Sequence, residues 1–173
     1  KQLLAKVREY GMRCVGPNCL GVVNTHPDIR MDGCFAESLP ERGNIGFVSQ
    51  SGALGGGILN ILKDLNLGFA QFISIGNQAD VNAETALEYW ENEADVEQIL
   101  LYMESIQNPA NFRKLASRIS RKKPILALKA GRSAAGASAA SSHTGSLAGA
   151  DKAANALLAQ SGVIREYSLK DLF

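Results

Sequence analysis

The stretch NIGFVSQSGALGGGILNILKDLNLGFAQFISIG, residues 44–76, decides the fold. Two runs rich in apolar and β-branched residues, at 45–49 and 69–75, flank a segment of helical period. The first run, IGFVS, is apolar on both faces, which is typical of a parallel strand covered by helices on each side. The apolar residues of the middle segment recur on one helix face: Ile58, Ile61, Leu62 and Leu65. The stretch predicts a strand–helix–strand unit with a right-handed crossover.

The same unit recurs toward the C-terminus. Further strand runs stand at 98–104, 124–129 and 163–167. Helix signals lie between them, because Asn82 can cap one helix and Asn108–Pro109 can open another. The spacing is that of βα units rather than hairpins, so we predict an α/β domain with a doubly wound, mostly parallel sheet.

Two regions do not fit this alternation of strands and helices. Residues 16–44 contain no convincing helix and read as a connection between units. Residues 131–149, GRSAAGASAASSHTGSLAG, form a loop of small residues that is long for an α/β domain. This loop follows a strand, and doubly wound sheets bind ligands at the carboxyl ends of their strands.

Composition excludes several protein classes. Lys and Arg total 18 against 17 Asp and Glu, so a net charge of +1 argues against nucleic acid as a partner. With 46% hydrophobic and 20% charged residues the chain is not disordered, and no apolar run is long enough for a membrane span. Three cysteines without CxxC spacing predict reduced cytoplasmic thiols rather than disulfides or a metal site. Because the chain begins without Met, we expect it to be part of a longer protein.

The first candidate for chemistry is His143, inside the small-residue loop. Neighbours such as Thr144 and Gly145 offer a hydroxyl and backbone amides that can hold an anion. A loop of so little bulk would give the imidazole reach and mobility. The alternative is an exposed histidine without a role, which is the commoner case.

A second candidate is Ser51-Gly52-Ala53, which follows a strand and opens a helix. Free N–H groups at a helix N-terminus, together with the helix dipole, favour phosphate. The segment matches neither the dinucleotide fingerprint nor the P-loop. A tight strand-to-helix turn without a ligand is the alternative.

A third candidate is Glu104, at the end of the strand QILLYME. A carboxylate there can accept the Nδ1–H of a histidine and leave Nε2 free as the nucleophile. A solvated charge at a strand end is the alternative. Asn77 and Asp80 read as turn residues.

Several segments together resemble one family, and they cover nearly the whole chain. They are GPNCLG (16–21), GNIGFVSQSGALG (43–55), SIGNQADVN (74–82), LLYMES (100–105) and KAGRS…SSHTGSLAG (129–149). The chain resembles the α-type subunit of NDP-forming acyl-CoA synthetases. It is similar to ADP-forming acetate–CoA ligases more than to succinyl-CoA synthetase.

The resemblance implies a flavodoxin-like fold and a role for each matching residue. His143 would be phosphorylated transiently, with Glu104 orienting it. Ser51, Gly52 and Ala53, with Thr144 and Gly145 beside the histidine, would bind the phosphoryl group. Asn18 and Cys19 would lie near the acyl group. The implied reaction is reversible: acyl-CoA, ADP and phosphate give the acid, CoA and ATP.

The resemblance also implies a domain organisation. Residues 1–24 would be the end of a CoA-binding Rossmann-like domain and its connection, and residues 25–173 the succinyl-CoA synthetase-like domain. CoA and ADP or ATP with Mg would bind mainly outside this chain, on that upstream domain and on an ATP-grasp domain or subunit. We expect no resident metal here, a small acyl substrate, and a cytoplasmic oligomer.

Other functions remain open at this point. One is a regulatory, synthetase-like domain of a protein acetyltransferase that senses CoA or nucleotide. Another is a binding module without chemistry, which would leave His143 unphosphorylated. A flavodoxin-like electron carrier shares the fold class, but no flavin phosphate loop rich in Ser and Thr is present.

Overall fold

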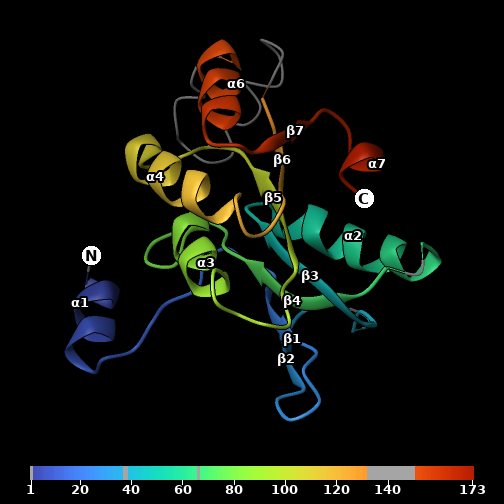
Figure 1. The fold of residues 1–173 in the computed structure, drawn as a ribbon. Coiled ribbons are helices and arrows are strands. Elements are labelled where there is room, and N and C mark those ends of the chain that lie inside the picture. Colours follow the sequence, from blue (N-terminus) through green and yellow to red (C-terminus); the bar gives the residue numbers. More distant parts are fainter. Residues whose placement is uncertain (1, 37–38, 66, 132–150) are drawn as a thin grey trace.

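The computed structural model describes residues 2–36, 39–65, 67–131 and 151–173. Its centre is a seven-stranded sheet with the order β2-β1-β4-β3-β5-β6-β7 (Figure 1). The strands are β1 (Gly21–Asn24), β2 (Met31–Cys34), β3 (Arg42–Ser49), β4 (Phe69–Ser74), β5 (Gln98–Met103), β6 (Ile125–Lys129) and β7 (Ile164–Glu166). Strands β4, β3, β5, β6 and β7 pair in parallel. The predicted α/β class with a mostly parallel sheet is confirmed.

Helices lie between the parallel strands, as the sequence predicts, and further helices stand near both ends of the chain. They are α1 (Gln2–Glu9), α2 (Gly52–Asp64), α3 (Ala83–Trp90), α4 (Pro109–Ile119), α6 (Asp151–Gln160) and α7 (Leu169–Leu172). Both predicted caps are formed. Asn82 Oδ1 accepts the N–H of Thr85 at 2.9 Å, and Asn108 Oδ1 accepts that of Asn111 at 3.1 Å. Each cap satisfies an amide that the first helical turn leaves unpaired.

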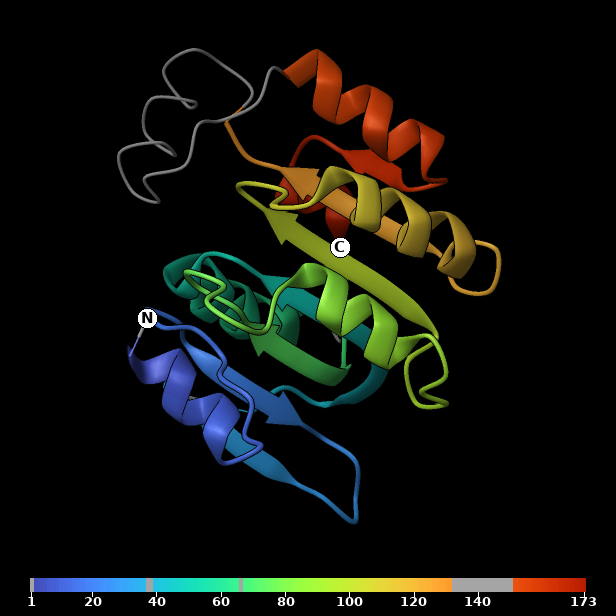
Figure 2. The ribbon, with the colours of Figure 1, turned by 90° about the vertical axis from the view of Figure 1, so that its left-hand side faces the viewer.

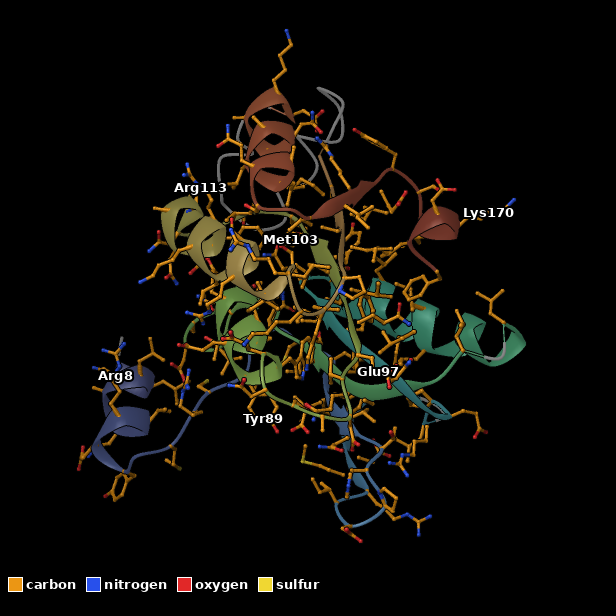
Figure 3. The ribbon with its side chains drawn as sticks, in the orientation of Figure 1. Arg8, Tyr89, Glu97, Met103, Arg113 and Lys170 are labelled. Atoms are coloured by element: carbon orange, nitrogen blue, oxygen red, sulfur yellow. The ribbon has the colours of Figure 1, made fainter. Side chains whose placement is uncertain are left out.

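The helices cover the sheet on both faces, with an apolar core on each side (Figure 2). Helices α3, α4 and α6 pack on one face, where Trp90 is fully buried and its indole N–H donates to Gln71 Oε1 at 2.8 Å. Helices α2 and α7 pack on the other, against an aromatic group that includes Phe47 and Phe72. In Figure 3, Met103 lies inside this sandwich, whereas Arg8, Arg113 and Lys170 point outward.

The region between residues 16 and 44 holds two strands that the sequence analysis missed. Strands β1 and β2 form an antiparallel pair, and β1 also pairs antiparallel with β4. They extend the sheet beyond its parallel part, so the sheet is mixed. Strand β1 lies on the N-terminal side of the expected boundary at residue 24, yet it is hydrogen-bonded into the sheet. The division of the chain at that boundary stays a prediction.

Candidate functional site

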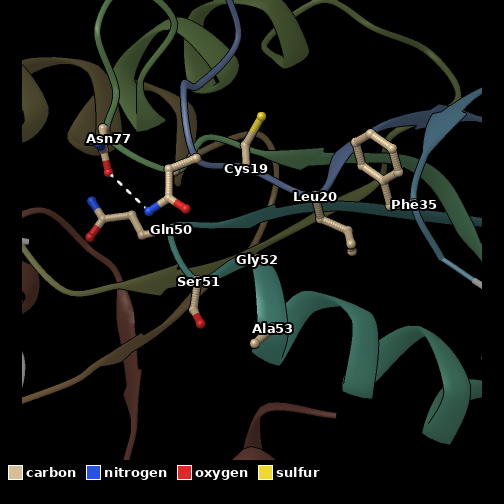
Figure 4. Close-up of a pocket in the computed structure, with 10 residues that line it drawn as sticks. Cys19, Leu20, Phe35, Gln50, Ser51, Gly52, Ala53 and Asn77 are labelled. Carbon is tan, nitrogen blue, oxygen red and sulfur yellow. Dashed lines mark hydrogen bonds between the residues drawn. The ribbon is translucent and has the colours of Figure 1, made fainter. Parts of the chain in front are cut away.

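A pocket with a volume of about 300 Å³ lies at the carboxyl end of β3, where α2 begins (Figure 4). Its lining comes from four separate segments of the sequence: Asn18, Cys19, Leu20, Phe35, Gln50, Ser51, Gly52, Ala53, Gly76 and Asn77. None of these residues is an Asp, Glu, Lys, Arg or His. A ligand's charge would therefore be met by dipoles and N–H groups.

The N-terminus of α2 supplies such groups. Ser49 Oγ donates to the Ser51 carbonyl at 2.7 Å and so fixes the turn between strand and helix. Ser51 Oγ accepts the N–H of Leu54 at 3.3 Å, as an N-cap residue does. Within the described residues, the N–H groups of Gly52 and Ala53 have no hydrogen-bond partner. Together with the helix dipole they form an anion-accepting wall of the pocket.

The opposite wall is the loop after α1, and a second loop holds it in place. Asn77 N–H donates to the Pro17 carbonyl at 2.9 Å, and Ala79 N–H donates to the Gly16 carbonyl at 2.9 Å. Asn18 Nδ2 also reaches Asn77 Oδ1 at 3.4 Å, the dashed line in Figure 4. The Asn18 and Asn77 amides thus stand side by side at the pocket, where they can hydrogen-bond a ligand's oxygen atoms.

Asp80 anchors the same loop. Its carboxylate accepts the N–H of Cys14 at 2.8 Å and the guanidinium of Arg13 at 2.9 and 3.2 Å. The bond from Arg13, followed by that from the Cys14 amide, lowers the pKa of Asp80 below its ordinary value. Asp80 is therefore more than the turn residue that the sequence analysis expected.

Glu104 stands immediately after β5, the neighbour of β3 in the sheet. It is 8% exposed, and its Oε2 atom is buried with no hydrogen-bond partner among the described residues. The side chain of Gln50 holds the backbone here: its Oε1 accepts the N–H groups of Glu104 and Ser105, the latter at 2.8 Å. Gln50 Nε2 donates to the Ser105 carbonyl at 2.7 Å. The loop that carries Glu104 is thereby fastened to the pocket.

A buried lysine, Lys129, lies beside this loop. Lys129 ends β6, pairs in register with Met103 and is 8% exposed. Its Nζ donates to the Ala130 carbonyl at 2.6 Å. Burial, and secondly Arg165, lower the pKa of Lys129, whereas Asp151 and Glu104 act in the opposite direction. The carboxyl edge of β5 and β6 thus carries a buried acid and a buried base.

The structure brings together most of the residues that the sequence analysis selected. Ser51, Gly52, Ala53, Asn18 and Cys19 line one pocket, and Glu104 lies at the adjacent strand end. His143, Thr144 and Gly145 lie outside the described residues. The sequence analysis missed Leu20, Phe35, Gln50, Gly76 and Asn77 in the pocket lining.

The described residues hold neither a candidate metal centre nor a candidate membrane-spanning helix. In this part of the chain, no group of three or more His, Cys, Asp or Glu side chains is arranged to hold a metal ion. No helix among these residues has both the length and the apolar character needed to cross a membrane.

Comparison with known proteins places the domain in a family. The model of the succinyl-CoA ligase like flavodoxin domain matches residues 42–173. The chain belongs to this family. The match begins with β3 and spans the α2 N-terminus and Glu104, but it leaves out the loop with Asn18 and Cys19.

Relatives of this family domain cover nearly all of the chain. It is 44% identical over 165 residues to the acetate–CoA ligase [ADP-forming] of Methanocaldococcus jannaschii, a match of 95% of this chain and 23% of that ligase. It is 43% identical to the α subunit of acetate–CoA ligase [ADP-forming] II of Pyrococcus furiosus, covering 35% of that subunit. The chain therefore spans between about a quarter and a third of these relatives.

Solved structures agree with the family assignment. The dinucleotide-forming acetyl-coenzyme A synthetase 1 of Ca. Korarchaeum cryptofilum, in complex with phosphate and ADP, superposes with a TM-score of 0.93 at 35% identity. The match covers 99% of this chain and 37% of that one. The resemblance proposed from the sequence is thus confirmed.

Proposed function

We propose that this chain is the phosphohistidine-carrying module of an ADP-forming acyl-CoA synthetase. The observation that carries the proposal is the pocket at the N-terminus of α2, whose Gly52 and Ala53 N–H groups are available to an anion. Such an N-terminus stabilises phosphate without a charged side chain. The kinship with ADP-forming acetate–CoA ligases supports the same chemistry.

The first step of this reaction takes place in the pocket. A phosphate oxygen attacks the thioester carbonyl of an acyl-CoA, the C–S bond breaks, and CoA leaves as the thiol after taking a proton. The N–H groups of Gly52 and Ala53 bind the phosphate and the resulting acyl phosphate. A volume of about 300 Å³ suits a small acyl group beside the phosphate. Leu20 and Phe35 supply its apolar surface, with Asn18 and Cys19 on the same wall.

His143 takes the phosphoryl group in the second step. Its Nε2 attacks phosphorus, the bond to the acyl oxygen breaks, and the acid is released. Glu104 would accept the Nδ1–H and so fix the tautomer, which leaves Nε2 unprotonated as the nucleophile. This role is supported by the burial of Glu104 and by its Oε2 atom, which has no hydrogen-bond partner in the part of the chain that the structure describes. Thr144 and Gly145 would hold the phosphoryl group on the histidine.

The third step passes the phosphoryl group from phosphohistidine to ADP. We propose that CoA, the nucleotide and Mg bind mainly through other parts of the longer protein. A CoA-binding domain upstream of residue 24 and an ATP-grasp domain or subunit would be these partners. Relatives three to four times longer than the matched segment support this division of labour. We further propose a cytoplasmic, oligomeric enzyme.

Labelling with phosphate tests the pocket's role without nucleotide. The full-length protein, with its partner subunit if separate, is incubated with acetyl-CoA and ³²P-phosphate, and label on the protein is measured. We expect incorporation in the wild type, and a loss of at least about 100-fold in Ala53→Asp, because a carboxylate at the helix N-terminus competes with phosphate. Ala53→Ser is the matched control and should keep label within about threefold. Equal labelling of Ala53→Asp and Ala53→Ser would contradict the assigned pocket.

A further inference from the structure

One side chain, that of Gln50, ties the two halves of the candidate site together. Strands β3 and β5 pair in parallel as far as Ser49 and Tyr102. Beyond that point the Gln50 N–H still donates to the Tyr102 carbonyl at 3.1 Å. The Gln50 side chain continues this pairing. Its Oε1 accepts the N–H groups of Glu104 and Ser105, and its Nε2 donates to the Ser105 carbonyl. The side chain acts as one extra peptide group that prolongs the pairing.

The same residue borders the phosphate wall. Gln50 directly precedes Ser51, the N-cap of α2, and it lines the pocket while being only 6% exposed. A movement of the Gln50 backbone would therefore displace the helix N-terminus. A movement of its side chain would displace the Glu104 backbone. Within the described residues the Oε2 atom of Glu104 has no hydrogen-bond partner, so no hydrogen bond from this atom fixes the side chain.

The chemistry of the amide explains why glutamine stands here. The three contacts need an oxygen that accepts two N–H groups and a nitrogen that donates to a carbonyl. Glutamate lacks the donor, and lysine and arginine lack the acceptor. Asparagine is one methylene shorter. Methionine matches the length but keeps none of the bonds.

From this arrangement we propose that Gln50 is a positioning residue, which holds the Glu104 carboxylate at a fixed place relative to the phosphate pocket. The inference rests on the proposed function, in which one histidine must meet both Glu104 and the acyl phosphate. Phosphoryl transfer depends steeply on such alignment, and a misplacement of about 1 Å costs on the order of 100-fold in rate. Gln50 touches the backbone of Glu104 and acts through it.

The test compares Gln50→Met with Gln50→Glu in the full-length protein. The rate of phosphoryl transfer to the protein is measured in single turnovers with acetyl phosphate, over a range of concentration and pH. We expect Gln50→Met to lower the saturated rate about 10- to 100-fold and to change half-saturation less than about threefold. In Gln50→Glu a second carboxylate lies near Glu104, so the pH–rate profile of this variant should move to higher pH relative to the wild type.

A matched control separates positioning from stability. Gln71 is another buried glutamine, which accepts the Trp90 N–H on the α3 face of the sheet. Gln71→Met should lower the thermal midpoint as Gln50→Met does, but leave the saturated rate and the pH profile unchanged. Normal rates in Gln50→Met, or a loss confined to half-saturation, would overturn the inference. Equal effects of Gln50→Met and Gln71→Met on the saturated rate would also overturn it.

Hydrogen exchange tests the hydrogen bonds between Gln50 and the Glu104 and Ser105 amides without relying on activity. We expect the amides of Glu104 and Ser105 to exchange at least about tenfold faster in Gln50→Met, relative to amides in the centre of β5. Unchanged protection of these two amides would refute the role of the Gln50 side chain in holding them. An unlabelled wild type with normal protection would instead refute the proposed function, and with it the positioning role.

Discussion

The backbone of Gly76 runs against that of Asn18, so closely that a Cβ atom on Gly76 would stand 2.3 Å from the Asn18 carbonyl oxygen. Gly76 also has a φ of +48°, in the left-handed region that favours glycine. The pocket wall formed by the loop after α1 thus depends on the missing side chain of a residue in another loop. Asn77, the next residue, donates its N–H to that wall.

Gly76→Ala should therefore damage both the fold and the pocket. The left-handed backbone and the clash predict a loss of about 2–3 kcal/mol in the free energy of unfolding, together with weaker phosphate binding. Chemical denaturation and calorimetric titration with phosphate measure the two effects. Gly57→Ala is the control, because Gly57 lies in α2 with nothing within 4 Å of its added Cβ. It should stabilise by roughly 1 kcal/mol; the same gain in Gly76→Ala would contradict the packing argument.

Asp80 should make the protein's stability sensitive to acid. Its pKa is lowered in the folded state, so its contribution is present above the ordinary carboxyl value of 3.8 and is lost as the pH falls through the lowered value. Asp80→Asn should lower the melting temperature by about 3 °C at pH 7, because charged hydrogen bonds to Arg13 and Cys14 become neutral ones. The difference from wild type should shrink below about pH 4. A difference that stays constant down to pH 2 would contradict this prediction.

Glu84 should make stability depend on pH in the opposite direction from Asp80. It is 4% exposed at the start of α3, and its Oε1 atom has no hydrogen-bond partner among the residues that the structure describes. Burial raises its pKa above the ordinary 4.5, so the wild type should lose stability as the pH rises from 4.5 to the raised value. Glu84→Gln should remove that loss and gain about 1 kcal/mol at pH 7. Glu88→Gln, on the exposed side of the same helix, should change unfolding by less than about 0.5 kcal/mol. Urea denaturation at pH 5 and 7 decides, and a destabilised Glu84→Gln at pH 7 would contradict the argument.

Glu104→Gln should slow phosphoryl transfer and leave the stability of the fold nearly unchanged. An amide in the same place cannot stabilise a charged imidazole as a carboxylate does, so labelling of the protein by acetyl phosphate should slow by about 100- to 1,000-fold. Its melting temperature should stay within about 3 °C of wild type. Glu166→Gln, at the end of β7 in the same sheet, is the matched control and should label normally. Equal rates for both variants would remove Glu104 from the mechanism.

The parallel part of the fold was predictable because its signals are local. Strand β3 is an apolar run, and Asn82 and Asn108 cap their helices through residues three positions ahead. Strand β2, with the sequence MDGC, is mostly exposed at the edge of the sheet. It lacks the buried apolar pattern that predicts a strand, and the pairing of β1 with β4 is a long-range contact that no short pattern encodes.

The residues of the candidate site likewise include some with a local sequence signal and some without one. Ser51-Gly52-Ala53 could be found from the sequence, because a strand followed by small residues at a helix start is a local signal for anion binding. Gln50 could not, since its partner Ser105 lies 55 residues away. Gly76 likewise gains its role only from the approach of Asn18. Contacts between distant loops define this pocket, and only the folded chain brings them together.

The most direct test of the phosphohistidine relay uses the two histidines of the chain. The full-length protein with its nucleotide-binding part, as wild type, His143→Asn or His26→Asn, is incubated with Mg and γ-³²P-ATP. The relay predicts label on wild type and His26→Asn that survives base and is lost in acid, and none on His143→Asn. Label that persists in His143→Asn, or an unlabelled wild type whose partner binds nucleotide, would contradict the account.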